Sequence, residues 1–263
     1  MSTWNPSDYA QHSSAQQVWA RELIAKLHLR GDERVLDIGC GDGKVTAEIA
    51  TAVPRGYVLG TDNSPDMIAY ASATHQTSNL RFQVADASAL PFKGEFDVIF
   101  SNACLHWIYD HRPVLAGIRR ALAARAGGRG MLQMGGRGNA AEVLAVVDTV
   151  IATPRWEPFF RNFTFRYGFH APDDYRRWLI EAGLRPIRVE LVPKTMHHAG
   201  REGLLGWFRT TWLPYLNAIP AEHRDQFLDQ MAHEYLIRHP PGSANDVQVA
   251  MVRLEVECDL LSA

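Results

Sequence analysis

Three glycines on alternate positions, directly after a short apolar run, constrain this chain most. Residues 34–38 (RVLDI) lead into 39–43 (GCGDG), and helical character returns from Lys44. Glycine accepts positive φ and leaves no Cβ between the backbone and a ligand. In a parallel sheet, nucleotides bind in the crevice at the carboxyl end of such a strand. The motif therefore predicts a strand, a tight loop and a helix that form a nucleotide-binding crevice.

Strands and helices alternate on both sides of this loop. We expect strands at 57–62, 80–84, 96–101 and 130–134, and helices at 15–29, 44–52, 65–73 and 112–125. Alternation with short connections is typical of a parallel sheet with helices on both faces. The sequence therefore predicts an α/β fold.

Beyond Gly138 the pattern becomes mostly helical. We expect helices at 140–153, 173–182, 202–211 and 221–238, and late strands at 186–192 and 247–257. The helical stretch between these strands is too long for a loop, which indicates a cap. We therefore expect a single domain over residues 1–263. Its sheet core is predicted at 30–137, 184–198 and 245–259, and its cap and insertions at 1–29, 138–183 and 199–244.

The loop spacing bears on which nucleotide binds. A dinucleotide fingerprint has the form G-x-G-x-x-G, and Lys44 stands where its third glycine would be. Asp37 and Asp42 oppose a pyrophosphate but suit a ligand that carries an ammonium and a sulfonium group. This pattern disfavours an NAD-dependent oxidoreductase, which stays an alternative.

Two further carboxylates end the next two predicted strands. Asp62 lies where an acid accepts hydrogen bonds from a ribose diol, and Asp86 is a candidate acceptor for an adenine amine. Met67 is a candidate for packing on the purine. Alternatively, each acid only caps the helix that follows it.

With these acids, the loop resembles that of the class I methyltransferases, which use S-adenosylmethionine (SAM). The resemblance implies a Rossmann-like, mostly parallel sheet of seven strands with one antiparallel strand, helices on both faces and a helical cap. It also implies SAM as cofactor. The cofactor-binding residues that it implies are Gln16, Asp37, Gly39, Gly41, Asp62, Asn63, Met67, Asp86, Ala87 and Asn102.

Weaker motifs resemble the trans-aconitate methyltransferase group within this family. They are the N-terminal segment with Trp4, Tyr9 and Gln16, the run SNACLHW at 101–107, and a cap segment with Trp207, Arg209, Trp212, Pro214 and Tyr215. The resemblance implies O-methylation of a small carboxylic acid, such as trans-aconitate or a related acid. N- or C-methylation of another metabolite stays open, and so does a SAM-binding regulatory protein without turnover.

The acceptor pocket is expected to combine cations with aromatic walls, because arginine clamps carboxylates and aromatic rings enclose the rest of an acid. The candidate catalytic residues are His106, Trp107 and Arg209. The candidate substrate-binding residues are Trp4, Tyr9, Trp107, Arg166, Arg209 and Trp212. His106 is either a general base or a packed histidine. The tryptophans are alternatively core residues, and Arg209 a surface charge.

Net charge and cysteine content indicate which binding partners and which cell compartment to expect for this protein. A net charge of -2, from 27 Lys and Arg against 29 Asp and Glu, favours neither nucleic acid nor a membrane surface. The 3 cysteines are far apart, and we expect neither disulfides nor a metal site. No signal peptide or membrane span is visible, so we expect a cytoplasmic protein with a small-molecule methyl acceptor. The sequence leaves the oligomeric state open.

Overall fold

A computed structural model of the chain describes residues 14–124 and 127–261. These residues form two compact units. The sheet unit comprises 14–124, 127–137, 167–192 and 253–261. The helical unit comprises 138–166 and 193–252. Each unit is described by itself.

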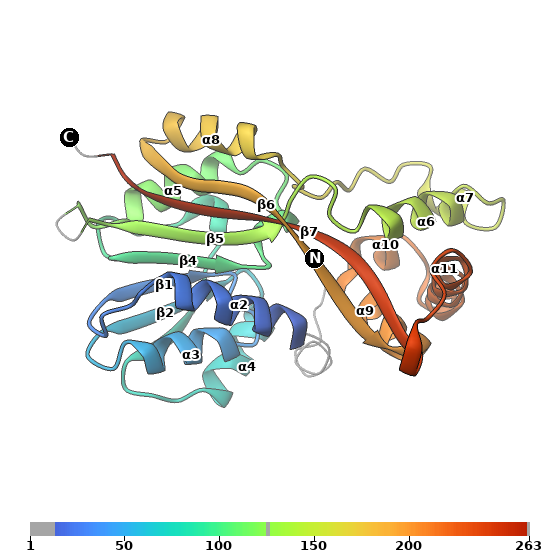
Figure 1. The fold of residues 1–263 in the computed structure, drawn as a ribbon, viewed down its shortest axis with the longest axis horizontal. Helices are drawn as coiled ribbons and strands as arrows, with labels where there is room; N and C mark the ends of the chain where they lie inside the picture. Colours follow the sequence, from blue (N-terminus) through green and yellow to red (C-terminus); the bar gives the residue numbers. More distant parts are fainter. Residues whose placement is uncertain (1–13, 125–126, 262–263) are drawn as a thin grey trace. The chain divides into compact units, whose positions relative to one another are not determined.

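A seven-stranded sheet has the order β3-β2-β1-β4-β5-β7-β6 (Figure 1). The strands are β1 Arg34–Ile38, β2 Tyr57–Asp62, β3 Leu80–Val84, β4 Val98–Asn102, β5 Arg129–Gly135, β6 Leu184–Ala199 and β7 Asp246–Leu260. Strands β1 to β5 pair in parallel, and β7 pairs antiparallel to β5. This topology confirms the predicted class I methyltransferase fold. The carboxyl ends of the parallel strands share one edge, where ligands bind in such sheets.

Helices cover both faces of this sheet (Figure 1). On one face lie α2 Ser14–Lys26, α3 Lys44–Ala52 and α4 Pro65–Thr74; on the other lie α5 Arg112–Ala121 and α8 Pro172–Glu181. Apolar residues at helical spacing explain the packing. In α5, for example, Val114, Leu115 and Ile118 are fully buried. Because both faces are covered, the central strands β1, β4 and β5 are buried at every position except one end of each strand.

Several element ends differ from the sequence predictions. Helix α2 ends at Lys26 instead of Leu29, because His28 adopts a φ of 46° that a right-handed helix does not allow. Helix α5 ends at Ala121, where Leu122 turns extended. The predicted helix at 221–238 divides into a 3-10 turn, Ala221–His223, and α11, Arg224–Arg238.

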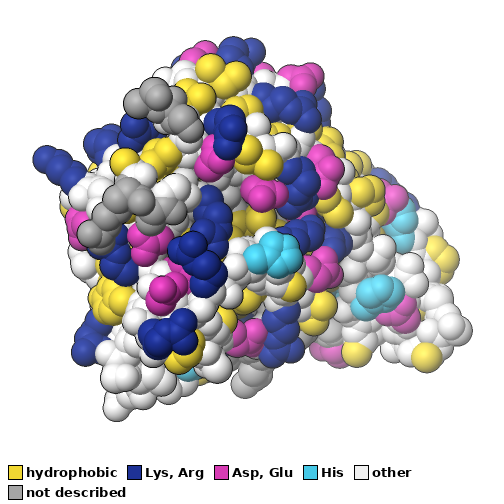
Figure 2. Space-filling model, turned by 60° about the vertical axis from the view of Figure 1, so that its left-hand side comes forward, with side chains coloured by type: hydrophobic (Ala, Val, Ile, Leu, Met, Phe, Trp, Pro, Cys, Tyr) yellow, Lys and Arg dark blue, Asp and Glu magenta, His cyan; other side chains and the backbone are white. Residues whose placement is uncertain are grey.

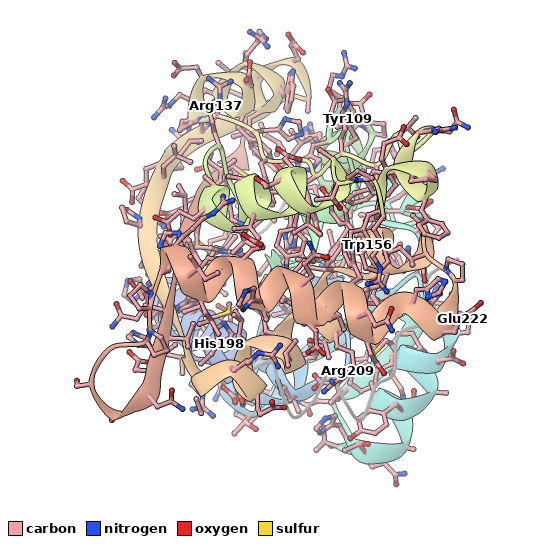
Figure 3. All side chains as sticks on the ribbon, turned by 90° about the vertical axis from the view of Figure 1, so that its right-hand side faces the viewer. Tyr109, Arg137, Trp156, His198, Arg209 and Glu222 are labelled. Atoms are coloured by element: carbon pink, nitrogen blue, oxygen red, sulfur yellow. The ribbon has the colours of Figure 1, made fainter. Side chains whose placement is uncertain are left out.

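The helical unit contains α6 Ala141–Ile151, α7 Glu157–Phe160, α9 Gly200–Thr211, α10 Leu213–Asn217 and α11. Helix α11 packs against α6 and α9. Trp156 is nearly fully buried beside α11, and its indole N–H donates to Oε1 of Gln230 at 2.7 Å (Figure 3). Its ring also meets Phe227 edge-on at 5.2 Å. Aromatic packing therefore gives this unit its own core.

The unit boundaries differ from the predicted core and cap. Helix α2 belongs to the sheet unit, because its residues Ala20 and Leu23 share a core cluster with the strands. Helix α8 also belongs there, since Tyr175 and Leu179 pack in the cluster that contains α5. Conversely, 193–199 of β6 and 246–252 of β7 belong to the helical unit. No helix in the described part of the chain has the length and apolar character to span a membrane.

Candidate functional site

The glycine loop between β1 and α3 has the backbone that the sequence predicted. Gly39, Gly41 and Gly43 have φ values of 77°, 54° and 80°, where other residues are strained. The backbone N–H groups of Gly39 and Cys40 donate to the carbonyl of Thr61 in β2, at 2.7 and 2.9 Å. These bonds fix the loop at the carboxyl edge of the sheet.

Gly39 is required for a second reason. A Cβ at this position would lie 2.0 Å from Sγ of Cys104, which follows β4. Cys104 therefore packs directly against the loop backbone. The absence of a side chain at Gly39 therefore allows two protein segments to pack directly against each other.

Asp37, at the buried end of β1, carries an unusual carboxyl group. Its Oδ2 accepts a hydrogen bond from the hydroxyl of Thr46 in α3 at 2.7 Å. Burial, followed by the nearby charge of Asp62, raises the pKa of Asp37 to about 7. A cation brought close to this group would favour its ionised form.

The sequence suggested that Asp42 adds negative charge to the crevice, but the structure shows this carboxylate paired within the loop. Its Oδ2 lies 3.4 Å from Nζ of Lys44, and its Oδ1 accepts from the Lys44 N–H at 3.3 Å. Lys44 therefore neutralises Asp42. The acidic character of this edge rests on Asp37 and Asp62.

Asp62 is the last residue of β2, and each of its carboxylate oxygens accepts a hydrogen bond from a backbone N–H group. Its Oδ2 accepts from the N–H of Gly41 at 3.1 Å, and its Oδ1 accepts from that of Ser64 at 2.9 Å. Burial raises its pKa. An ionised carboxylate has about four lone-pair positions, so it keeps acceptor capacity for a ligand. Asn63, which follows it, is exposed.

The contacts of Asp86 and Met67 also fit a purely structural role, in which Asp86 caps a turn and Met67 packs inside the protein. Oδ1 of Asp86 accepts from the N–H of Ser88 at 2.8 Å and so caps the 3-10 turn Ala87–Ala89. Asp86 itself is exposed, which leaves its other lone pairs accessible. Met67 lies in the first turn of α4 and is only 3% exposed. Both residues follow strands at the same edge as the glycine loop.

The segment after β4 presents His106 on a 3-10 turn, Leu105–Trp107. Asn102 is the last residue of β4, and the N–H of Ala103 donates to Gln133 in β5. The N–H of Gly135 donates to Nδ1 of His106 at 3.4 Å. Burial lowers the pKa of His106 well below its usual value, and the charge of Arg253 adds to this. The ring is therefore neutral, and its proton is on Nε2.

Aromatic side chains of 167–169 surround this turn within the sheet unit. Tyr167 and Phe169 stack in parallel at 4.8 Å, and the Trp107 ring lies 5.4 Å from Tyr167. His106 lies 6.0 Å from Phe169. Between them, the N–H of Gly168 donates to the His106 carbonyl, and a Cβ there would lie 2.1 Å from the Ile108 carbonyl oxygen. Only glycine lets the two segments approach so closely.

A buried histidine anchors the end of the same segment. Nε2 of His111 donates to the Ile108 carbonyl at 2.9 Å, and Nδ1 accepts from the Tyr175 hydroxyl at 2.8 Å. Burial and the charge of His170 lower the pKa of His111 to about 4. The neutral ring thus joins the segment to α8.

The remaining predicted site residues belong to the helical unit or lie outside the described residues. Arg166 and Arg209 belong to the helical unit and are exposed, Arg209 in the last turn of α9 (Figure 3). Trp212 is 3% exposed and packs against Trp207 and Tyr215 at 5.9 and 5.6 Å, which fits a core residue. Trp4, Tyr9 and the side chain of Gln16 lie outside the described residues.

The structure adds residues that the sequence did not single out as site residues. Thr46 binds Asp37, Cys104 fills the space beside Gly39, and Arg253 acts on His106. Arg253 had only a weak signal, because it is the first of four charged residues on alternate positions of β7, with Glu255, Glu257 and Asp259. The other two look ordinary in sequence.

Charged side chains of both signs are interspersed on the face shown in Figure 2. That face has no large area of one sign. This distribution agrees with the net charge of -2.

Comparison with known proteins gives consistent matches. A family model described as a methyltransferase domain matches residues 35–125. The chain is 34% identical over 233 residues to a trans-aconitate 2-methyltransferase of Deinococcus radiodurans, covering 86% of this chain and 88% of that protein. It is 31% identical to the enzyme of that name from Methylobacterium radiotolerans, covering 97% and 98%. A solved Bacillus halodurans structure, provisionally designated a methyltransferase, superposes with a TM-score of 0.63 at 19% identity, covering 91% and 97%.

Proposed function

Because this chain belongs to the class I SAM-dependent methyltransferases, in the group of the trans-aconitate 2-methyltransferases, we propose that it methylates a carboxylate oxygen of a small acid. Trans-aconitate or a related acid is the proposed acceptor. That the protein is a methyltransferase and uses SAM follows from the family. The acceptor and the acceptor atom are the proposal.

The sheet unit fits the cofactor by charge. When bound, SAM supplies an electrophilic methyl group on a positively charged sulfur. Asp37 and Asp62 provide the negative charge that a cationic ligand requires, and Asp42 is neutralised within the protein. Burial holds the pKa of Asp37 high, so a bound cation stabilises its ionised form.

The proposed contacts with the cofactor follow the order of the strands. Gly39 and Gly41 line the methionine part, Asp62 binds the ribose, and Asp86 with Ala87 binds the adenine. The other proposed cofactor contacts are Gln16, Asn63, Met67 and Asn102.

The state of His106 is the observation that carries the choice of a carboxylate. A general base at this position needs a ring nitrogen with a free lone pair. Nδ1 already accepts from Gly135, and Nε2 carries the proton. A hydroxyl or ammonium acceptor must lose a proton during methylation, whereas a carboxylate is already ionised at neutral pH. The arrangement therefore favours an acid as nucleophile.

What the chain contributes is alignment and exclusion of water. Trp107 is proposed to form one wall of the acceptor pocket. The remaining proposed substrate contacts are Trp4, Tyr9, Arg166, Arg209 and Trp212. A cytoplasmic location stays a prediction.

The test is a methyl-transfer assay with radiolabelled SAM. The panel contains trans-aconitate, simpler di- and monocarboxylic acids, their neutral amides, amines and phenols. We expect label only in the acids, as methyl esters that release methanol on mild alkaline treatment. An N- or C-methyl product survives this treatment, and its appearance would reject O-methylation.

A SAM-binding protein without turnover is distinguished in the same experiment. It would bind SAM in calorimetry but label no acceptor in the panel or in a metabolite extract. Asp62→Ala is the control, because loss of labelling in this variant ties the product to the proposed cofactor site.

A further inference from the structure

Arg253 lies at the carboxyl edge of the sheet, beside the proposed acceptor site. In the register of β5 and β7 it is the partner of Gly135, the last residue of β5. It is only 3% exposed, and its guanidinium carbon lies 5.4 Å from the centre of the Trp19 ring in α2. A buried guanidinium at a ligand-binding edge is unusual, because charged groups are costly to remove from water.

An ion pair on the face of β7 that carries Arg253 shows where this residue lies in the sheet. Two residues further along β7, Glu255 is fully buried and binds Lys26 of α2 at 2.6 Å. Trp19 and Lys26 are two helical turns apart, so α2 runs along this face of β7. The Lys26–Glu255 pair lies toward the opposite edge of the sheet, whereas Arg253 lies at the carboxyl edge.

His106 is the neighbour of Arg253 across Gly135. Its Nδ1 accepts from the Gly135 N–H, and the positive charge of Arg253 acts on the imidazole. His106 thus offers Nε2–H as a donor, next to a guanidinium with five N–H donors. Both residues belong to the sheet unit.

We propose that Arg253 and the Nε2–H of His106 together bind the anionic acceptor and determine the specificity for acids, an inference that rests on the proposed function. Guanidinium and carboxylate pair in a planar, bidentate way, which fixes orientation. The donors hold carboxylate oxygens other than the attacking one, whose lone pair must stay available. Trp107, Tyr167 and Phe169 provide aromatic walls beside His106.

A purely structural role for Arg253 makes a different prediction. The cation–π contact with Trp19 is of a kind that can attach α2 to the sheet. In that case Trp19→Leu and Arg253→Met would have the same effects, namely a lower melting temperature and an unchanged KM for the acceptor. Substrate binding predicts that only Arg253→Met raises KM.

The experiment measures melting temperature, SAM affinity, kcat and KM for Arg253→Met, Arg253→Lys, Trp19→Leu, His106→Leu and His106→Gln. The acceptor is trans-aconitate, or whichever acid the wild type methylates fastest. We expect Arg253→Met to raise KM at least about thirtyfold with SAM affinity within about twofold, given the cost of losing a charged hydrogen-bond partner. Arg253→Lys, which keeps the charge, should lie between it and the wild type. His106→Gln, which keeps a donor, should retain more activity than His106→Leu.

Arg188→Met is the matched control. Arg188 lies in β6 and binds Glu255 at 2.8 Å. Its loss should lower the melting temperature and leave KM unchanged. If both Arg253 variants keep the wild-type KM, the inference is rejected; if Arg253→Met does not fold, Arg253→Lys decides alone. Failure of the proposed function is seen separately, because the wild type would then methylate no acid.

Discussion

The backbone N–H of Gly41 donates a hydrogen bond to Oδ2 of Asp62 at 3.1 Å, so one carboxylate joins the glycine loop to the end of β2. The other oxygen of Asp62 holds Ser64 at 2.9 Å. Asp62 therefore shapes the loop and is also available to a ligand. Its substitution removes both contributions.

We expect Asp62→Ala to weaken SAM binding at least about tenfold, because a charged hydrogen-bond acceptor is worth about 1.5–3 kcal/mol. Isothermal titration calorimetry measures this directly. Asp66→Ala is the control, since Asp66 is an exposed acid in the first turn of α4. Equal affinities for Asp62→Ala and the wild type would remove Asp62 from the cofactor site.

The raised pKa of Asp37, about 7, predicts a pH-dependent affinity for SAM. Below this pH the carboxyl is protonated, and a cationic ligand must displace the proton. Affinity should therefore rise by up to about tenfold per pH unit until pH reaches about 7, and then level off. Calorimetry between about pH 5.5 and 7.5 tests this, and Asp37→Asn should abolish most of the slope.

The raised pKa of the Asp37 carboxyl also predicts how the free energy of unfolding of the cofactor-free protein depends on pH. The pKa of Asp37 is about 7 in the folded protein, against an ordinary value of 3.8. Between these values the folded state holds a proton that the unfolded state has released. This contribution to the free energy of unfolding is present at low pH and is lost as pH rises to about 7. Urea unfolding of the wild type and Asp37→Asn should show the difference; parallel pH profiles would contradict it.

Gly39→Ala should destabilise the protein more than Gly94→Ala. Both residues have positive φ, 77° and 63°, but only at Gly39 would the new Cβ overlap a neighbour, Sγ of Cys104 at 2.0 Å. The backbone strain is worth about 1 kcal/mol at each site, and overpacking adds about 1–3 kcal/mol at Gly39. Denaturant unfolding measures both variants. Similar losses at the two sites would show that the Cys104 contact adjusts freely.

Tyr175→Phe should loosen the segment that carries His106. The variant removes the Tyr175 hydroxyl, which donates to Nδ1 of His111. Both residues are fully buried. We expect a loss of about 1–3 kcal/mol in the free energy of unfolding and a lower kcat. Tyr109→Phe is the control, because Tyr109 is 58% exposed in the same segment (Figure 3). A Tyr175→Phe enzyme with wild-type stability would argue against the anchor.

The sequence alone determined the alternation of strands and helices, the loop and the family, because these depend on local patterns, whereas β6 extends to 184–199, well beyond the predicted 186–192. The apolar runs that became β1, β2 and β3 were predicted at their observed bounds, and the positive φ of Gly39 and Gly41 followed from residue type. Asp62 was placed at the carboxyl edge by its position at the end of β2. Such features need no knowledge of distant segments.

Tertiary structure alone decided which side chains act on one another. Asp42 is close to Lys44 in sequence, yet only the loop conformation turns their side chains together. His106 and Arg253 are far apart in sequence, and they flank Gly135 only because β7 pairs antiparallel with β5 in one register. Protonation, burial and charge depend on these long-range contacts, so the chemical state of His106 and of Asp37 could not be read from their neighbours in the chain.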